Sequence, residues 1–145
     1  MNPHDIGNKG RIFEQNMMLK LQSLGGYDRL YEENELRKMF GWPSVGVDFL
    51  LVKGNNVIAI QTKYRKTRRR EDHGIGKFVK SIDFVLEMSN KNLVAGLWVS
   101  RIRPFDDNIE YLSKRKISCL NNFDNMDTLI EDTIKYIEHL LQYIN

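Results

Sequence analysis

Apolar residues recur every three or four positions in three stretches of the chain. This spacing predicts helices over residues 8–24, about 75–89 and 127–144. Gly25-Gly26 follows the first stretch and is a helix-ending signal. The third stretch is the most strongly amphipathic, with Asp127 as the expected N-cap and Asn125 as the alternative. Each predicted helix has one apolar face to bury against another element.

Nearly continuous apolar runs indicate the strands. Runs at about 46–53, 56–64 and 93–99 predict strands that are largely buried, and a short strand is expected near 116–120. The first two runs are joined by Lys53-Gly54-Asn55-Asn56, which is typical of a β-hairpin turn.

The remaining segments are less regular. Residues 28–44 are ambiguous, with one or two helical turns that would end at Gly41-Trp42-Pro43. The basic stretch 65–73 has no apolar period, so we expect a loop or an extension of the preceding strand. A short helix is expected near 107–114. The resulting order of helices and strands favours an α/β fold class, with a mixed central sheet flanked by helices on both faces.

The predicted hairpin brings three polar side chains together. A two-residue loop at Gly54-Asn55 sets Asp48 opposite Gln61, and Lys63 then projects from the same face as Gln61. A loop at Asn55-Asn56 would instead set Asp48 opposite Lys63, with all three residues still on one face. A carboxylate, an amide and an ammonium group on otherwise apolar strands are costly to bury unless they are paired or used.

This trio resembles the active-site core of the PD-(D/E)XK, or restriction-endonuclease-like, nuclease superfamily. The pattern of Asp48 followed by Gln61-Thr62-Lys63 is similar to the Mrr-like branch, whose Asp…Gln-X-Lys motif has Gln in place of the second acid. Upstream, Gly10–Glu14 and Leu24–Tyr27 are similar to the N-terminal pattern of that branch. The resemblance covers roughly residues 7–100 and implies an α/β/α core.

Two features depart from the pattern of the superfamily. Val47 stands before the aspartate where the motif has proline, and residues 28–44 are longer and more charged than a minimal connection between strands. Neither departure removes a residue of the motif.

The resemblance implies a metal-dependent endodeoxyribonuclease that uses Mg²⁺ or Mn²⁺. Asp48, Gln61, Glu14 and the main-chain carbonyl of Thr62 would bind the metal, which prefers hard oxygen ligands. Lys63 would orient or help to deprotonate the attacking water. The alternative is structural: Asp48 and Lys63 form a cross-strand ion pair, Gln61 is half-exposed, and Glu14 is a solvated acid near the positive end of a helix.

Cations cluster directly after the hairpin, although the net charge of the chain is only +3. Together with two lysines further on, we expect them to hold DNA phosphates; the alternative is a solvated charged loop. The expected contacts are Arg65, Lys66, Arg68, Arg69, Arg70, Lys77 and Lys80. Gly74–Lys77 lacks the pattern of a phosphate-binding loop and is expected to be a flexible entry to the next helix.

Composition narrows the classes of protein. A chain of 145 residues with 41% hydrophobic and 28% charged residues fits a single nuclease-like domain over 1–145. It has no apolar stretch long enough to cross a membrane, and Met1–Gly10 does not resemble a secretory signal, so we expect an intracellular protein, cytoplasmic or nuclear. The single Cys119 excludes an internal disulfide and is expected in the core. Trp42 and Trp98 are also expected there, with an exposed Trp42 as the alternative.

Two further functions stay open. A small basic domain suits a homodimer acting on branched DNA, as a Holliday-junction resolvase does. The same fold also suits a nucleic-acid-binding module without turnover. The expected partner in each case is DNA, duplex or branched.

Overall fold

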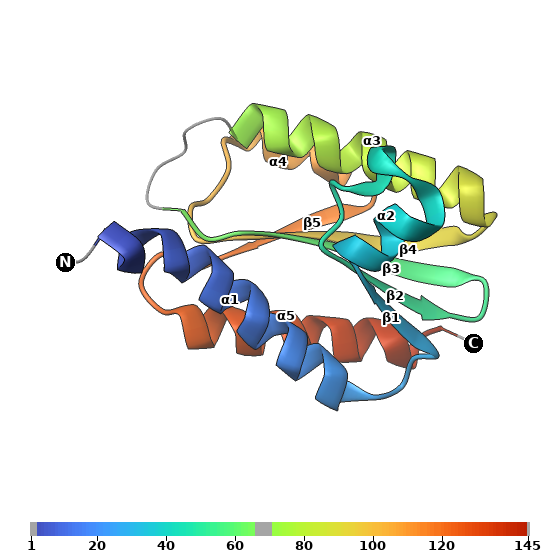
Figure 1. The fold of residues 1–145 in the computed structure, drawn as a ribbon, viewed down its shortest axis with the longest axis horizontal. Coiled ribbons are helices and arrows are strands. Elements are labelled where there is room, and N and C mark those ends of the chain that lie inside the picture. The colour runs from blue at the N-terminus through green and yellow to red at the C-terminus, as the bar shows by residue number, and fades with distance from the viewer. Residues whose placement is uncertain (1–2, 66–70, 145) are drawn as a thin grey trace.

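A computed structural model of the protein shows a central sheet between two layers of helices (Figure 1). The structure describes residues 3–65 and 71–144. The strands of its sheet are β1 (Arg29–Glu32), β2 (Phe49–Lys53), β3 (Asn56–Lys63), β4 (Asn92–Ser100) and β5 (Ile117–Asn121). The helices are α1 (Pro3–Leu24), α2 (Glu33–Phe40), α3 (Glu71–Ser89), α4 (Asp106–Ser113), α5 (Met126–Gln142) and the short 3₁₀ turn η1 (Trp42–Ser44).

The strands lie in the order β1-β2-β3-β4-β5. β1, β2 and β3 pair antiparallel, whereas β3, β4 and β5 run parallel, with α3 and α4 as the crossover connections. Parallel neighbours need such crossovers, which place helices over a face of the sheet. The expected α/β class, a mixed sheet with helices on both faces, is confirmed.

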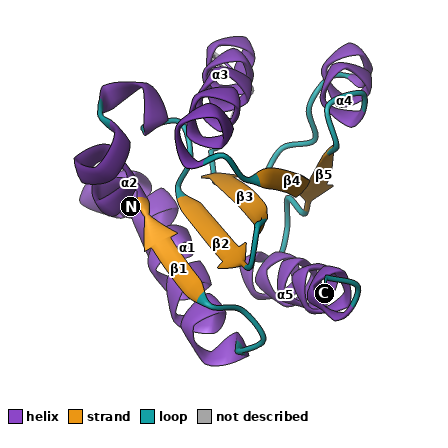
Figure 2. Ribbon diagram, turned by 90° about the vertical axis from the view of Figure 1, so that its right-hand side faces the viewer, coloured by secondary structure: helices purple, strands orange, loops and turns teal. Residues whose placement is uncertain are grey.

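Each face of the sheet has its own apolar core. α1 and α5 cover one face, and α2, α3 and α4 cover the other (Figure 2). Successive residues of β3 alternate between the two cores: Ile58 and Ile60 pack toward α1 and α5, whereas Val57 and Ala59 pack toward α2 and α3. We refer to these as the α1 face and the α3 face of the sheet.

Most expected elements are present, but the ambiguous segment 28–44 holds an unpredicted strand. All four residues of β1 pair with β2, but only Leu30 and Tyr31 are partly buried, so the apolar pattern is too short to identify a strand. α2 follows directly because Glu32 and Glu35 form a reciprocal capping box. Gly41, at a φ of 93° that favours glycine, then ends the helix.

α3 begins at Glu71, before the expected start, and α1 begins at Pro3. The expectation of a loop is therefore wrong for residues 71–73, and Gly74–Lys77 lies inside a helix rather than forming a flexible entry. Close packing explains the helical glycine, since a Cβ on Gly74 would lie 3.1 Å from the ring of Trp98. Tertiary contact here outweighs the low helix propensity of glycine.

Several single residues settle the remaining alternatives. Trp98 is fully buried, whereas Trp42 is 70% exposed, so the expectation of a buried Trp42 is wrong. Asn125, not Asp127, caps α5 by accepting a hydrogen bond from the Thr128 N–H at 2.9 Å.

Cys119 is only partly buried, at the margin of the core on the α3 face. None of the helices in the described part of the chain combines the length and the apolar character needed to cross a bilayer.

Candidate functional site

The β2–β3 hairpin has the register expected for a Gly54-Asn55 loop, since Lys53 pairs with Asn56. Continued past the last pair of β2, this register sets Asp48 opposite Gln61, and the Asp48 N–H donates to the Ile60 carbonyl at 2.9 Å. Asp48, Gln61 and Lys63 therefore gather at the end of the hairpin away from its loop. We refer to this as the open end.

Gln61 and Lys63 both face α3. Gln61 pairs in register with Trp98 of β4, and Trp98 belongs to the core on the α3 face. A Cβ added to Gly74 of α3 would lie 3.5 Å from the Lys63 side chain, which places that side chain beside the start of α3. The expected common face of the two residues is thus present.

Asp48 is 6% exposed and is held by Thr62. Its Oδ2 atom accepts hydrogen bonds from the Thr62 N–H at 2.8 Å and from the Thr62 hydroxyl at 2.7 Å. The ion pairs between described residues are Arg103–Asp106 and Lys114–Glu110, both outside this site. The structural alternative, a cross-strand ion pair of Asp48 with Lys63, is therefore not formed.

The segment before Asp48 is fixed against α3. The Gly46 N–H donates to the buried Ser81 hydroxyl at 3.0 Å. A Cβ on Gly46 would lie 2.7 Å from the Lys77 carbonyl oxygen, closer than real Cβ contacts, so only glycine fits. Val47 is fully buried. This close approach explains why glycine precedes the Val47–Asp48 pair and sets where the Asp48 carboxylate lies.

Two buried side-chain nitrogen or oxygen atoms of the described residues have no hydrogen-bond partner, and both lie at the open end. They are Gln61 Oε1 and Trp98 Nε1, on residues that pair across β3 and β4. Gln61 is only 7% exposed. Leaving a buried polar atom unpaired costs about 1–3 kcal/mol, so such atoms call for an explanation.

The backbone directs a further oxygen toward Asp48. The Ile60 carbonyl accepts from Asp48, and the Thr62 N–H donates to its carboxylate, so both groups point from β3 toward β2. In a strand, the N–H and C=O of one residue point to the same side. The Thr62 carbonyl therefore points to the side of β3 on which Asp48 lies, as the proposed metal ligation requires.

Glu14 lies on α1 beside this end of the sheet. The neighbouring Phe13 stacks on Tyr64, the residue after Lys63, with ring centroids 5.0 Å apart, which ties this turn of α1 to the end of β3. Burial, together with the charges of Asp48, Glu33 and Glu32, raises the pKa of Glu14 to about 7, and the Lys63 charge opposes this. Glu14 is thus half-buried among acids rather than solvated.

Glu33 is a charged residue of the site that sequence reasoning missed. It is the first residue of α2, and its N–H donates to the Asp48 carbonyl at 3.1 Å. Burial raises the pKa of its carboxyl, and the charge of Asp48 adds to this effect. The available signal was the Glu32-x-x-Glu35 capping box, which marks a helix start that the ambiguous segment concealed.

Burial dominates the electrostatics of the remaining charges. It raises the pKa of Asp48, against the opposing effects of the two Thr62 hydrogen bonds and of the Lys63 and Lys77 charges. It lowers the pKa of Lys63, and the Arg65 charge adds to this effect while Asp48 and Glu33 oppose it. Lysines shifted in this direction exchange a proton more readily near neutral pH.

The donor set fits a hard cation only if neutral oxygens take part. Among the described residues, no three His, Cys, Asp or Glu side chains converge to hold a metal by themselves. The Asp48 carboxylate, the unpaired Gln61 oxygen and the Thr62 carbonyl are oxygen ligands of the kind that Mg²⁺ accepts. Glu14 stands near them as an electrostatic neighbour of Asp48.

The described cations lie around this group. Arg65 is exposed where β3 ends, and Lys77 and Lys80 are exposed on α3. Lys77 is close enough to influence the pKa of Asp48, Glu33 and Lys63. The other expected phosphate contacts, Lys66, Arg68, Arg69 and Arg70, fall outside the described residues.

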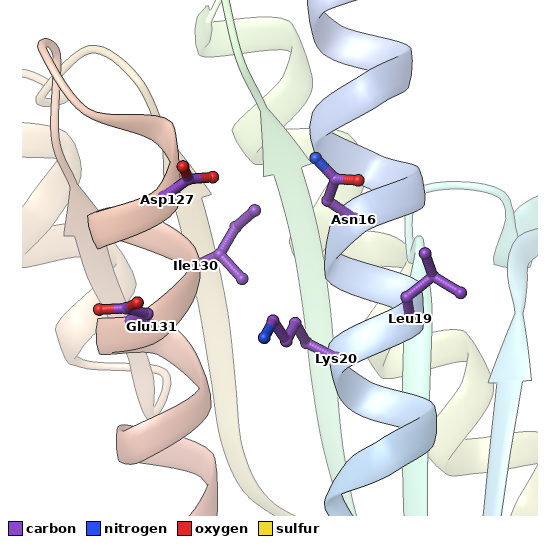
Figure 3. A pocket seen from close by; sticks show the side chains of 6 residues that line it. All are labelled: Asn16, Leu19, Lys20, Asp127, Ile130 and Glu131. Carbon is purple, nitrogen blue, oxygen red and sulfur yellow. The ribbon is translucent and has the colours of Figure 1, made fainter.

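The two flanks of α1 differ in character. On the Glu14 flank, a depression is lined by Arg11, Glu14, Gln15, Met18 and Glu32. On the other flank, a depression between α1 and α5 is lined by Asn16, Leu19, Lys20, Asp127, Ile130 and Glu131 (Figure 3). Lys20 and Ile130 project into that second space, which has no buried unpaired group. It therefore lacks the chemistry found at the open end.

Comparisons of the chain with protein-family models, with curated proteins and with solved structures find no match. The functional argument accordingly rests on the residues and geometry of the open end.

Proposed function

We propose that the protein is a metal-dependent endodeoxyribonuclease of the PD-(D/E)XK type, with the Asp…Gln-X-Lys arrangement of the Mrr-like branch. The observation that carries this proposal is the buried, unpaired Gln61 oxygen beside the buried Asp48 carboxylate. A structural role for these groups would pair them, as the ion-pair alternative requires. An oxygen-lined site for a divalent cation explains why the Gln61 oxygen is buried without a partner beside the carboxylate that Thr62 holds.

Asp48, Gln61 and the Thr62 carbonyl would hold Mg²⁺ or Mn²⁺, with Glu14 as a further carboxylate. When bound, such an ion stabilises charge on phosphate oxygens and makes a water molecule more acidic. Thr62 fixes the Asp48 carboxylate through its N–H and hydroxyl. Lys63, on the same face as Gln61, would take a proton from the attacking water or neutralise charge on the phosphate.

DNA is the substrate that best fits the surroundings of the site. Arg65, Lys77 and Lys80 present exposed cations at the end of β3 and on the adjoining helix. Such cations hold phosphates and give register without reading sequence. The proposal includes Lys66, Arg68, Arg69 and Arg70 as further phosphate contacts from the segment between β3 and α3.

The test is nicking and linearisation of supercoiled plasmid in Mg²⁺ or Mn²⁺ and in chelator. We expect cleavage only with the metal. Asp48→Asn should remove both Mn²⁺ binding, followed by calorimetry, and cleavage, because the amide loses the charge but can still accept the Thr62 hydrogen bonds. Asp124→Asn, at an exposed loop acid, is the matched control and should change neither.

DNA binding without cleavage in any divalent metal would identify a non-catalytic binding module instead. Retained cleavage in a homogeneous Asp48→Asn preparation would contradict the site assignment.

A further inference from the structure

An exposed tryptophan stands on a hydrogen-bonded turn six residues before Asp48. Trp42 is 70% exposed, although indole rings are usually well buried. Its turn is well fixed: the Ser44 hydroxyl donates to the Gly41 carbonyl at 2.7 Å, and the Val45 N–H donates to the Trp42 carbonyl at 3.1 Å. Pro43 further restricts the backbone. The ring is thus presented on a rigid turn rather than on a loose loop.

One side of the indole already carries a cation. The Arg37 guanidinium lies over the Trp42 ring, 5.0 Å from its centroid. Since Trp42 remains 70% exposed, the opposite side of the ring is accessible. Aromatic rings that are open on one side and backed by arginine are suited to stack a flat, electron-rich group.

Arg37 also links this ring to the candidate site. Glu33 and Arg37 lie one helical turn apart on α2, and the Arg37 charge acts on the pKa of Glu33. Glu33 in turn contacts the Asp48 backbone. Trp42 is six residues from Asp48 in the sequence, so their Cα atoms lie at most about 20 Å apart. A DNA strand covers this upper limit with the rise of about six nucleotides.

We propose that Trp42 stacks an unpaired base of the DNA substrate, so that the enzyme prefers DNA with a single-stranded segment or a branch near the cleavage site. This inference rests on the proposed function and names its substrate class. Bases inside an intact duplex are already stacked, and freeing one costs a few kcal/mol. Only a discontinuity in the duplex supplies a base that the ring can take at no such cost.

Charge favours a nucleic acid over a protein as the occupant. Arg37 lies over the ring, and Lys38, the next residue of α2, is exposed. Cations beside a stacking ring suit a base together with its phosphate. Met39 is also exposed on α2 but has no aromatic ring to stack a base, so it provides a matched control.

The test compares binding of a blunt duplex with that of the same duplex carrying a single-stranded tail, by fluorescence anisotropy in Ca²⁺ to suppress cleavage. Trp42→Ala should weaken binding of the tailed DNA by about 5- to 160-fold, the range for one lost base–aromatic stack, and that of the blunt duplex by less than about 2-fold. Trp42→Phe should restore part of the preference. Met39→Ala should bind as the wild type does.

Tryptophan emission gives a second readout. Trp98 is fully buried, so quenching by the tailed DNA should come from Trp42 and disappear in Trp42→Ala. Equal losses on tailed and blunt DNA, or no loss on either, would overturn the inference. These binding results are independent of turnover. An inactive wild type would count against the proposed function, whereas metal-dependent cleavage with no effect of Trp42 would count against the inference alone.

Discussion

The two ends of the β2–β3 hairpin differ in whether their polar groups have hydrogen-bond partners. At the loop end, three polar contacts join the hairpin to neighbouring segments. The Gly54 N–H donates to Asp28 at 2.8 Å, Lys91 donates to the Gly54 carbonyl at 3.0 Å, and Lys53 donates to the Leu141 carbonyl at 3.0 Å. These groups are exposed or partly exposed and are satisfied within the protein.

At the open end the polar groups are buried and only partly satisfied. Gln61 Oε1 has no partner. Burial raises the pKa of Glu14 and of Glu33, the charge of Asp48 adds to both shifts, and Glu33 adds to that of Glu14. Such an arrangement lowers stability, and proteins keep costly arrangements mainly where they serve binding or catalysis. The comparison therefore separates polar residues that stabilise the fold, at the loop end, from polar residues that are kept at a cost in stability, at the open end.

The largest expected effect is on cleavage, and it should distinguish Lys63 at the open end from Lys53 at the loop end. Lys63→Ala should lower plasmid cleavage by about 10²- to 10⁴-fold, the usual effect of losing a general acid–base group, and should leave Mn²⁺ binding intact. Lys53→Ala should reduce the free energy of unfolding by about 0.5–1.5 kcal/mol through its lost hydrogen bond but leave cleavage unchanged. Cleavage rates and chemical denaturation of both variants provide the check. Undiminished cleavage by Lys63→Ala would contradict the catalytic role proposed for Lys63.

Gly46→Ala should have the next largest effect, a loss of stability, because the added Cβ would meet the Ser81 hydroxyl and the Lys77 carbonyl. We expect a loss of about 1–3 kcal/mol in the free energy of unfolding. Gly76→Ala on α3 has open space around the added Cβ and should instead stabilise the protein by about 0.5–1 kcal/mol. Urea denaturation measures both. Similar effects of the two substitutions would contradict the close approach at Gly46.

Replacing the unpaired amide should separate stability from function. Gln61→Met removes a buried polar atom while keeping the length of the side chain, so in chelator it should raise the free energy of unfolding by up to about 2 kcal/mol. It should also abolish the stabilisation that Mn²⁺ gives the wild type. Gln22→Met, on the exposed side of α1, is the control. Thermal denaturation with and without Mn²⁺ is the measurement, and a destabilised Gln61→Met in chelator would contradict the unpaired state.

The smallest expected effect is a pH dependence. The folded-state pKa of Glu14 is about 7 against an ordinary value of 4.5, so the folded state binds more protons between these values and stability falls as the pH rises through them. Asp48, Glu32 and Glu33 produce this effect together with burial, and Lys63 opposes it. In chelator, Glu14→Gln should therefore raise the melting temperature more at pH 8 than at pH 5.

The control for this prediction is Glu87→Gln, at an exposed position of α3. Its effect on the melting temperature should be the same at both pH values. A Glu14→Gln variant with the same shift at pH 5 and pH 8 would show that Glu14 is solvated in the folded protein.

Patterns that repeat along the chain allowed much of this fold to be predicted. The hairpin register followed from its turn residues, and the apolar runs of β3 and β4 identified strands buried on both faces. The same register predicted that Asp48, Gln61 and Lys63 share one face at the open end. These predictions succeeded because local turn chemistry and apolar periodicity agree with the tertiary structure in this region.

The features that were missed depend on contacts between distant segments. β1 has too few apolar residues to show a period and is defined by its pairing with β2. Glu33 reaches the site only because this strand positions α2 beside Asp48. Trp42 is exposed on the turn that follows the Gly41 C-cap of α2, an outcome that composition does not reveal.

The shared core of α1 and α5 has a consequence for the order of events during synthesis. Phe13 and Met17 of α1 pack in one cluster with Leu129 and Ile137 of α5, residues made more than a hundred positions later. Contacts so distant in sequence form late. Phe13 also stacks on Tyr64, so α1 can dock on β3 early, but the cluster behind Glu14 is complete only once α5 has been made. A nascent chain would therefore hold the hairpin with its motif before the core on the α1 face is complete, and the proposed cleavage activity is expected only after α5 has been made.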